Sequence, residues 1–339
     1  MSSQLSLLFA RQFGLCGLKP EETVAVIAEI GKKRDHVEAA VLAAQQLGAA
    51  VILLESPSLS HPELPPHKAD DRGVAALLAA AGECDMVLDL TVGGLIHSDV
   101  RTRITGRGKR MLFVAEAADV LERLTSDSVV RERVEAGGAH LKRGSTLRVT
   151  SAAGTDLTAD ISGEDLPITM QWGYVDEPGR WDHWPSGFVA CFPRDRTAQG
   201  QIVLQPGDIL LPWVRPVQTH VTLKVVDGYI VSLDGDGADA FLLRDYFEAW
   251  NDPEVWALSH MGWGVHPAAR FSAVDVYSHR PMMGQEFRSA EGNFMWSTGS
   301  NRFANRFTPA HLDIPMHSCT VAVDDTVVVD AGRLVGGDR

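Results

Sequence analysis

The feature that most constrains the fold is an alternation of short apolar runs with helical segments over the first 140 residues. Residues 23–28 form a nearly all-apolar run rich in β-branched side chains, which is typical of a strand buried on both faces. A segment with apolar residues at helical spacing follows, with Asp35 as its expected N-cap and Gly48 at its end. Strands that alternate with helices indicate a parallel sheet with right-handed crossovers.

The same unit repeats along this part of the chain. Further strands are expected at residues 50–54, 86–90 and 111–114, and further helical segments at residues 71–81, 98–104, 115–124 and 128–136. The pair Gly93-Gly94 comes after one of these strands, at the kind of position where open α/β sheets bind ligands. It is not part of a GxGxxG or P-loop pattern, which argues against a nucleotide cofactor.

After about residue 138 the sequence changes to short, alternating, turn-rich segments. Strands are expected at residues 146–151, 202–204, 209–211, 221–226 and 229–233, and a helix at residues 242–250. Asp227-Gly228, between the last two strands, is a strong hairpin signal. We therefore predict an α/β domain with a mostly parallel sheet at residues 1–140. Residues 141–339 are predicted to form an α+β domain with a largely antiparallel sheet that carries the functional site.

Composition excludes several classes of partner. The 339-residue chain has a formal net charge of -13, which argues against a nucleic-acid partner. No apolar run approaches the roughly 20 residues of a membrane span, and the N-terminus lacks the features of a signal peptide. The four cysteines form no CxxC pair, which argues against a zinc knuckle or a disulfide framework. We expect a cytoplasmic protein without a nucleic-acid or membrane partner.

A histidine and an aspartate near the C-terminus are candidate metal ligands. If residues 309–317 are extended, His311 and Asp313 project from the same face, because side chains in a strand alternate. His260 is the best candidate for a third ligand. Two histidines and one carboxylate with open coordination positions form the facial triad of non-haem Fe(II) oxygenases. The alternative is a hydrogen-bonded histidine beside a capping aspartate.

Tryptophan and glycine residues gather beside histidines in two segments, residues 181–188 and 259–264. Tryptophan offers a large apolar face and glycine leaves room for a ring, so these segments suit a flat aromatic pocket. The alternative is that both segments belong to the core.

Four motifs in this half of the chain resemble those of the metallo-aminopeptidase superfamily of the aminopeptidase T type. They are Pro185-Ser186-Gly187, residues 260–265, Ser297-Thr298-Gly299 with Asn301, and His311-Leu312-Asp313. In the peptidases the resemblance implies two metals, held in part by two glutamates and a further histidine. Phe188, His260 and Met295 stand at those three positions here. Because a two-metal hydrolase needs carboxylates to bridge its ions, the substitutions argue against peptidase activity.

The ligands that remain resemble the mononuclear iron site of the 2,5-dihydroxypyridine 5,6-dioxygenase family, which is built on the same scaffold. The resemblance implies Fe(II) bound by His260, His311 and Asp313, and cleavage of a hydroxylated ring with O2. It also implies that His183 binds the substrate or acts as an acid or base, and that His97 accepts a proton from the substrate hydroxyl. Some of these dioxygenases carry a second histidine at the position of Ser186, which leaves the substrate open.

The predicted function is that of an Fe(II)-dependent, extradiol-like ring-cleaving dioxygenase that uses O2 and acts on a small aromatic substrate, a dihydroxypyridine or a related hydroxylated N-heteroaromatic. Trp184, Ser297 and Asn301 are predicted to bind the substrate. The resemblance to dimeric peptidases implies a homo-oligomer. The alternatives are a metallo-aminopeptidase or other zinc hydrolase, and a binding protein that has lost catalysis.

Overall fold

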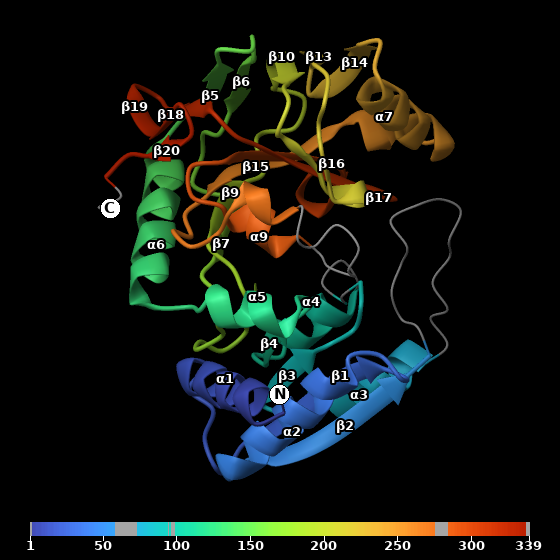
Figure 1. Ribbon diagram of the computed structural model, residues 1–339, viewed down its shortest axis with the longest axis vertical. Helices are drawn as coiled ribbons and strands as arrows, with labels where there is room; N and C mark the ends of the chain where they lie inside the picture. The colour runs from blue at the N-terminus through green and yellow to red at the C-terminus, as the bar shows by residue number, and fades with distance from the viewer. Residues whose placement is uncertain (1, 58–72, 94, 96–98, 275–283, 337–339) are drawn as a thin grey trace.

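The computed structural model describes residues 2–57, 73–93, 95, 99–274 and 284–336. A parallel sheet of strand order β2-β1-β3-β4-β8 forms the N-terminal region, at the bottom of Figure 1. Its strands are β1 (Thr23–Glu29), β2 (Ala50–Ser56), β3 (Met86–Asp89), β4 (Arg110–Phe113) and β8 (Trp181–His183). Every neighbouring pair in this sheet is parallel. The predicted α/β class of this region is confirmed.

Helices cover both faces of the parallel sheet, which explains why β1 is buried along almost its whole length. They are α1 (Ser2–Leu15), α2 (Arg34–Gln46), α3 (Val74–Gly82) and α4 (Asp99–Thr105). Val24 and Val26 pack in one core cluster with α1 and α2, whereas Ala25 and Ile27 pack in another with α3 and α4. Alternate side chains of β1 therefore pack against helices on opposite faces of the sheet. The helix α1 was not predicted from the sequence.

The prediction that Asp35 caps α2 is wrong. The N-cap is Lys33, which has a left-handed backbone conformation and makes no side-chain cap. Its ammonium donates to the carbonyl oxygens of Thr91 at 3.1 Å and Val114 at 2.9 Å. These tertiary contacts hold Lys33 at the end of the helix and leave Asp35 inside the first turn, where its carboxylate accepts from the backbone N–H of His36.

Two helices connect the parallel sheet to the rest of the chain. They are α5 (Ala118–Arg123) and α6 (Ser128–Arg143). Asp127 caps α6, because its side chain accepts from the backbone N–H of Val130 at 2.9 Å. The predicted boundary at residue 140 falls inside α6, and β8 returns from the later part of the chain to pair with β4. The division into residues 1–140 and 141–339 stays a prediction.

Two large antiparallel sheets build the C-terminal region, in the upper part of Figure 1. The eight-stranded sheet has the order β14-β13-β10-β6-β5-β18-β19-β20. Its strands are β5 (Thr146–Ser151), β6 (Asp156–Asp160), β10 (Gln199–Leu204), β13 (Val221–Val226), β14 (Tyr229–Asp234), β18 (Cys319–Val323), β19 (Thr326–Asp330) and β20 (Arg333–Leu334). The predicted antiparallel character is confirmed.

A five-stranded sheet of order β17-β16-β15-β9-β7 lies closer to the parallel sheet. Its strands are β7 (Ile168–Gln171), β9 (Phe188–Cys191), β15 (Leu258–Gly264), β16 (Phe294–Asn301) and β17 (Arg306–Met316). The remaining elements are β11 (Ile209–Leu210), η2 (Leu211–Trp213), β12 (Arg215–Pro216), α7 (Ala238–Ala249), η3 (Pro253–Trp256), η4 (Phe271–Ala273), α9 (Gln285–Ser289) and η5 (Arg302–Ala304). The predicted extended run at residues 309–317 lies largely within β17.

The predicted hairpin is confirmed as β13 and β14. Asp227 and Gly228 form its turn with φ values of 48° and 76°, as a tight turn of this kind requires. One hydrophobic core joins the two regions, since Phe9 of α1 and Trp263 of β15 belong to the same buried cluster. In the part of the chain that the structure describes, no helix has both the length and the apolarity needed to span a membrane.

Candidate metal centre

The structure brings His260, His311 and Asp313 together. Asp313 Oδ1 lies 3.4 Å from His260 Nε2 and 3.3 Å from His311 Nε2. One ligand-type atom from each of the three side chains lies within 4.8 Å of the other two. Donor atoms bound to one ion at about 2.1 Å are separated by about 3.0 to 3.4 Å in neighbouring octahedral or tetrahedral positions. The cluster therefore has the dimensions of a metal site.

Strand alternation and a bulge produce this arrangement. His311 and Asp313 project from one face of β17, as residues two apart in a strand do. His260 lies in β15, which β16 separates from β17. The pairing of β15 with β16 is irregular between Leu258 and Met261, and the His260 N–H donates instead to Ser297 Oγ at 2.9 Å. A bulge of this kind re-aims the side chain, and the His260 and His311 rings lie 5.3 Å apart.

Arg288 of α9 fixes the orientation of the carboxylate. Its Nε and Nη2 atoms each lie 2.7 Å from Asp313 Oδ2. The other oxygen, Oδ1, is buried beside the two imidazoles and has no hydrogen bond among the described residues. An oriented carboxylate with one oxygen engaged and the other turned toward two imidazole nitrogens fits a metal ion.

The protonation states of His260 and Asp313 also suit a metal. Burial lowers the pKa of His260 to about 4, although the charge of Asp313 opposes this shift. Burial by itself would raise the pKa of Asp313, but the charges of His311 and Arg288 outweigh it and hold this pKa well below its usual value. Near neutral pH the site therefore offers a neutral His260 imidazole and an ionised carboxylate, which are the forms that bind metals.

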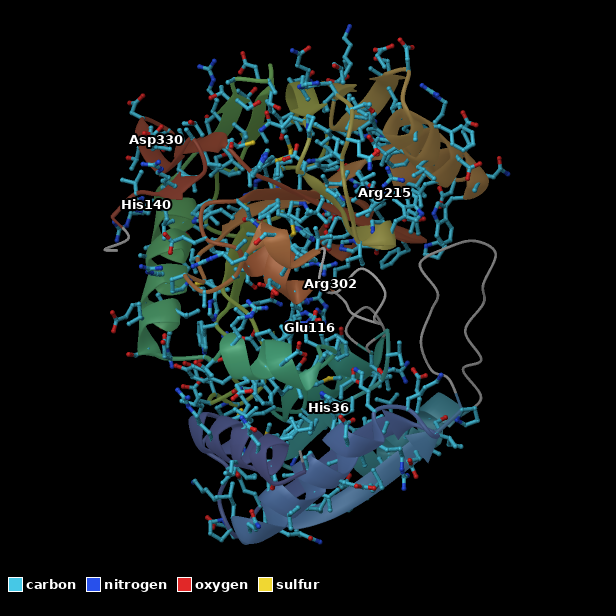
Figure 2. All side chains as sticks on the ribbon, in the orientation of Figure 1. His36, Glu116, His140, Arg215, Arg302 and Asp330 are labelled. Atoms are coloured by element: carbon cyan, nitrogen blue, oxygen red, sulfur yellow. The ribbon has the colours of Figure 1, made fainter. Side chains whose placement is uncertain are left out.

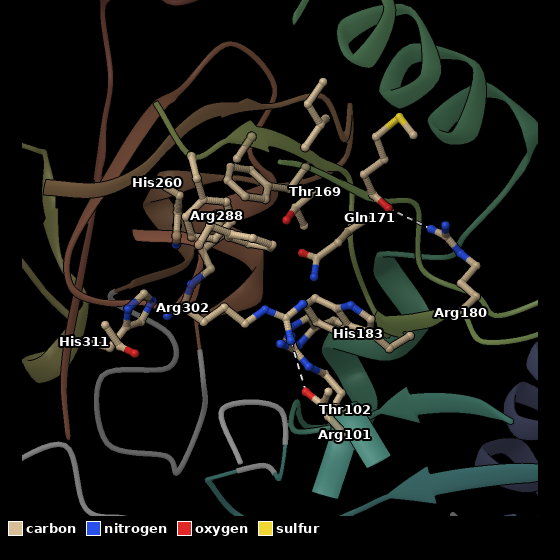
Figure 3. Close-up of a pocket in the computed structure, with 18 of the residues that line it drawn as sticks. Arg101, Thr102, Thr169, Gln171, Arg180, His183, His260, Arg288, Arg302 and His311 are labelled. Atoms are coloured by element: carbon tan, nitrogen blue, oxygen red, sulfur yellow. Dashed lines mark hydrogen bonds between the residues drawn. The ribbon is translucent and has the colours of Figure 1, made fainter. Parts of the chain in front are cut away.

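The cluster lines a cavity of about 570 Å³, a size typical of small-molecule sites (Figure 3). Phe188 and Phe192 of the β9 segment and Phe303 of η5 contribute aromatic surface. Arg101, Arg180, Arg288 and Arg302 contribute positive charge. The cavity thus combines flat apolar walls with a cationic lining. Of the tryptophans in the two predicted segments, Trp181 lines the cavity, whereas Trp184 and Trp263 are core residues.

Two of the positions at which the peptidases are expected to carry ligands form an apolar wall. Phe188 and Met295 pack with Ala190 in a small buried cluster, and the Phe188 ring lies 6.1 Å from that of His260. Over the described ranges, no second group of three His, Cys, Asp or Glu side chains converges on one point. The described residues thus offer a single three-ligand cluster beside an apolar wall.

His183, at the end of β8, faces this cavity from the parallel sheet (Figure 3). Gln285 Nε2 lies 2.8 Å from His183 Nδ1. Because an amide nitrogen only donates, Nδ1 accepts and Nε2 carries the ring hydrogen. Burial, followed by the charges of Arg288 and Arg101, lowers the pKa of His183 to about 3. The side chain is therefore a neutral hydrogen-bond donor near pH 7.

Gln285 is itself held by a residue of the parallel-sheet region. Its backbone N–H donates to Glu116 Oε1 at 2.8 Å. Glu116 follows β4 and lies near the middle of the molecule, between its upper and lower parts (Figure 2). Burial raises the pKa of this carboxyl group. Glu116, Gln285 and His183 thus form a chain of contacts from the parallel sheet to the cavity.

Three other predicted site residues, Trp184, Ser297 and Asn301, lie outside the cavity lining. His97 lies outside the described residues. Trp184 packs in the core, with its ring 5.2 Å from that of Phe9. Ser297 lies behind His260, and Asn301 Oδ1 accepts from two backbone N–H groups at the start of η5. None of these three described residues lines the cavity, and their role in substrate binding stays a prediction.

Several polar residues of the cavity were not predicted from the sequence, among them Arg101, Gln285, Arg288 and Arg302. Gln285 and Arg288 are three residues apart, the spacing that puts two side chains on one face of a helix. However, α9 has only 5 residues, too few for a periodic pattern. Arg101 and Arg302 come from segments remote in sequence, so no local pattern relates them.

The fold and the cluster together define a two-region protein of the aminopeptidase T fold with one two-histidine, one-carboxylate centre. The solved structure of wild-type AmpT from Thermus thermophilus matches with a TM-score of 0.65 at 14% identity, covering 98% of both chains. This likeness concerns the fold alone. The family model for 2,5-dihydroxypyridine 5,6-dioxygenase matches residues 4–336, and the chain belongs to this family.

Two comparisons with Pseudomonas putida proteins agree with this membership. The 2,5-dihydroxypyridine 5,6-dioxygenase of strain KT2440 is 36% identical over an alignment of 347 positions, which covers 100% of this chain and 98% of that protein. The solved structure of 2,5-dihydroxypyridine dioxygenase from strain KT2440 matches with a TM-score of 0.94 at 36% identity, covering 100% of this chain and 99% of that one. The family resemblance seen in the sequence is confirmed.

Proposed function

We propose that this protein is an Fe(II)-dependent dioxygenase that cleaves the ring of 2,5-dihydroxypyridine, or of a closely related hydroxylated N-heteroaromatic, with O2. The observation that carries the proposal is the cluster of His260, His311 and Asp313 in the wall of an aromatic cavity. Membership of the 2,5-dihydroxypyridine 5,6-dioxygenase family supports the choice of reaction and substrate class.

The three side chains of the cluster would hold the iron. Two imidazoles and one carboxylate leave coordination positions open for two reactants, which favours Fe(II). The chemistry that Fe(II) supplies at such a site is electron transfer between an electron-rich ring and O2. Arg288 keeps Asp313 in one orientation, so that a single oxygen of the carboxylate faces the imidazoles.

Other residues of the cavity bind and orient the ring. Phe188 and Phe192 provide flat surfaces beside His260, with ring-centre distances of 6.1 and 5.5 Å. His183 Nε2–H can donate a hydrogen bond to a ring oxygen, because Gln285 occupies the other ring nitrogen. His97 is proposed to accept the proton of the substrate hydroxyl, as the family resemblance implies.

The ring compound and O2 together supply all the atoms and electrons of the proposed reaction. The ring bond beside the hydroxyl-bearing carbon breaks, and both atoms of O2 enter the product. That carbon becomes a carboxyl group, and its neighbour becomes a formyl group on the ring nitrogen. The ring supplies all the electrons that reduce O2, so no external reductant is needed.

The decisive experiment is O2 uptake by protein that has been purified anaerobically and loaded with Fe(II). With 2,5-dihydroxypyridine we expect one O2 consumed per ring and both atoms of isotopically labelled O2 in the product. Aminoacyl-arylamides with zinc or cobalt serve as the control for the hydrolase alternative and should not be cleaved. Hydrolysis that a chelator abolishes, or ring consumption without O2 uptake, would contradict the proposal.

A further inference from the structure

Two arginines from remote parts of the chain line the same side of the cavity. Arg101 comes from α4 and Arg302 from η5. Arg302 Nη1 donates to the hydroxyl of Thr102, the neighbour of Arg101, at 3.0 Å. Arg101 Cζ lies 4.3 Å from the centre of the Trp181 ring. In Figure 3, Arg101 and Thr102 lie across the drawn cavity from His260 and His311.

The other charged groups of the cavity already have partners. Arg180 pairs with Asp182 at 2.8 Å, Arg288 with Asp313 at 2.7 Å, and Glu177 with Arg131 at 3.2 Å. Within the described part of the chain, neither Arg101 nor Arg302 forms an ion pair with a carboxylate. The cavity wall therefore carries two positive charges that its own acidic groups do not neutralise.

The environment of Arg101 agrees with an uncompensated charge. Burial, followed by the charge of Arg302, lowers the pKa of Arg101 to about 10. Both influences act in the same direction, and no carboxylate of the described residues opposes them. A bound anion would supply the missing opposite charge in a partly desolvated place, where charge-assisted hydrogen bonds are strong.

We propose that Arg101 and Arg302 form an anion-binding subsite that recognises an oxyanion carried by a small planar ring. The oxyanion is a carboxylate or an ionised ring hydroxyl, because planar guanidinium groups match such oxygens. The aromatic walls of the cavity supply the surface for the ring. The inference rests on the proposed function only in taking a ring compound as the substrate. A ring anchored at this subsite and at the metal would have one orientation, which favours reaction at a single bond.

Calorimetric binding of benzoate and benzamide, without O2, tests this subsite. The two probes have nearly the same shape and differ in charge. We expect benzoate to bind at least about tenfold more tightly than benzamide, since hydrogen bonds to charged groups are stronger than those between neutral groups. The preference should weaken as NaCl is raised, because salt screens charge. It should persist after EDTA treatment, which excludes binding of benzoate to iron as its cause.

Arg101→Gln and Arg302→Gln should each lower the affinity for benzoate about tenfold or more and change that for benzamide less than about twofold. Arg103→Gln is the matched control, because Arg103 lies on the same helix but lines a different cavity with Gly82 and Arg107. It should leave both affinities unchanged. Arg302 is exposed, so its replacement tests the subsite even if Arg101→Gln fails to fold.

Benzoate affinity no greater than benzamide affinity, or benzoate affinity retained in both glutamine variants, would overturn the subsite. Absence of benzoate binding at any accessible concentration would overturn it as well. Because binding is measured without O2, failure of ring cleavage leaves this result unaffected. Conversely, a protein that cleaves 2,5-dihydroxypyridine yet shows no preference for benzoate disproves only the subsite.

Discussion

The two oxygens of Asp313 have different partners: Oδ2 binds Arg288, and Oδ1 faces His260 and His311. Because Arg288 engages Oδ2, only Oδ1 of the carboxylate is available to bind a metal ion. Replacing His260, His311 or Asp313 singly by Ala should lower bound iron to a background level and abolish turnover, because two ligands do not hold the ion. Metal analysis of anaerobically loaded protein measures this loss. His220→Ala, at an exposed position, is the control and should keep full iron. Full iron and activity in His260→Ala would mean that another residue is the third ligand.

Replacing Arg288 tests the orientation of Asp313 without removing any of the three candidate metal ligands. Arg288→Met removes both contacts to Asp313 Oδ2 while keeping a long side chain. We expect iron affinity to fall about 10- to 100-fold, the usual range for a partner that orients a ligand. Competition with a chelator of known affinity measures the change. Arg288→Lys keeps the positive charge but loses the two-pronged guanidinium, so its iron affinity should lie between those of the wild type and Arg288→Met. An unchanged affinity in Arg288→Met would show that β17 alone orients Asp313.

Two histidines compete for the role of proton acceptor. If His97 takes the proton of the substrate hydroxyl, His97→Ala should leave iron nearly unchanged and lower kcat by about 10² to 10⁴. The loss should shrink at high pH, where the substrate arrives ionised. His183 serves as the comparison, because its neutral ring donates from Nε2. Replacement of His183 by Ala should raise KM and leave the pH dependence of kcat nearly unchanged. Wild-type kcat in His97→Ala across the pH range would exclude His97.

Among the elements, β16 and β17 have a close approach that only glycine allows. Gly299 has a φ of 90°, and a Cβ there would lie 2.1 Å from the carbonyl oxygen of Ala310. Gly299→Ala should therefore destabilise the fold by more than about 1 kcal/mol and, because Gly299 pairs with His311, should also weaken iron binding. Denaturant unfolding and metal analysis measure the two effects.

The control for this prediction is another glycine. Gly14 lies in α1 and has no atom within 4 Å of an added Cβ. Gly14→Ala should be neutral or stabilise by about 0.5–1 kcal/mol, since alanine favours a helix more than glycine does. Equal destabilisation by Gly299→Ala and Gly14→Ala would mean that the close approach of Gly299 to Ala310 is not the cause of the loss of stability.

The elements also show which signals in the sequence were sufficient. Alternation along β17 was enough to put His311 and Asp313 on one face, and apolar β-branched runs were enough to predict β1 and the parallel sheet. The bulge at His260 could not be predicted, because it arises from the pairing of β15 with β16. The contact between Gln285 and His183 joins residues 102 positions apart, and sequence alone gives no register for it.

At the scale of the whole molecule, buried histidines link stability to pH. His266 is only 3% exposed, and burial lowers its pKa to about 4. The folded state therefore keeps this ring neutral while the unfolded chain protonates near its usual pKa of about 6.5. The contribution of neutral, buried His266 to the free energy of unfolding is fully present above about pH 6.5 and is lost as the pH falls toward 4.

His266→Gln removes that contribution to the pH dependence. Between pH 7.5 and 5, the wild type should lose about 2 kcal/mol more than the variant in its free energy of unfolding. Urea unfolding in the presence of EDTA measures this difference and removes any effect of bound metal. His220→Gln, at an exposed position, is the control and should follow the wild type. Parallel pH profiles for wild type and His266→Gln would contradict the linkage.

The strand β8 has a consequence for how the protein is made. The parallel sheet takes its last strand from residues 181–183, on the far side of β5, β6 and β7 in the chain. During synthesis the N-terminal region therefore emerges with β4 as an unpaired edge, and the sheet is completed only after much of the next region has left the ribosome. A fragment that ends at residue 140 would retain that open edge and would lack His183. The two regions are thus coupled in assembly, and the same strand that completes the sheet carries a polar group into the cavity.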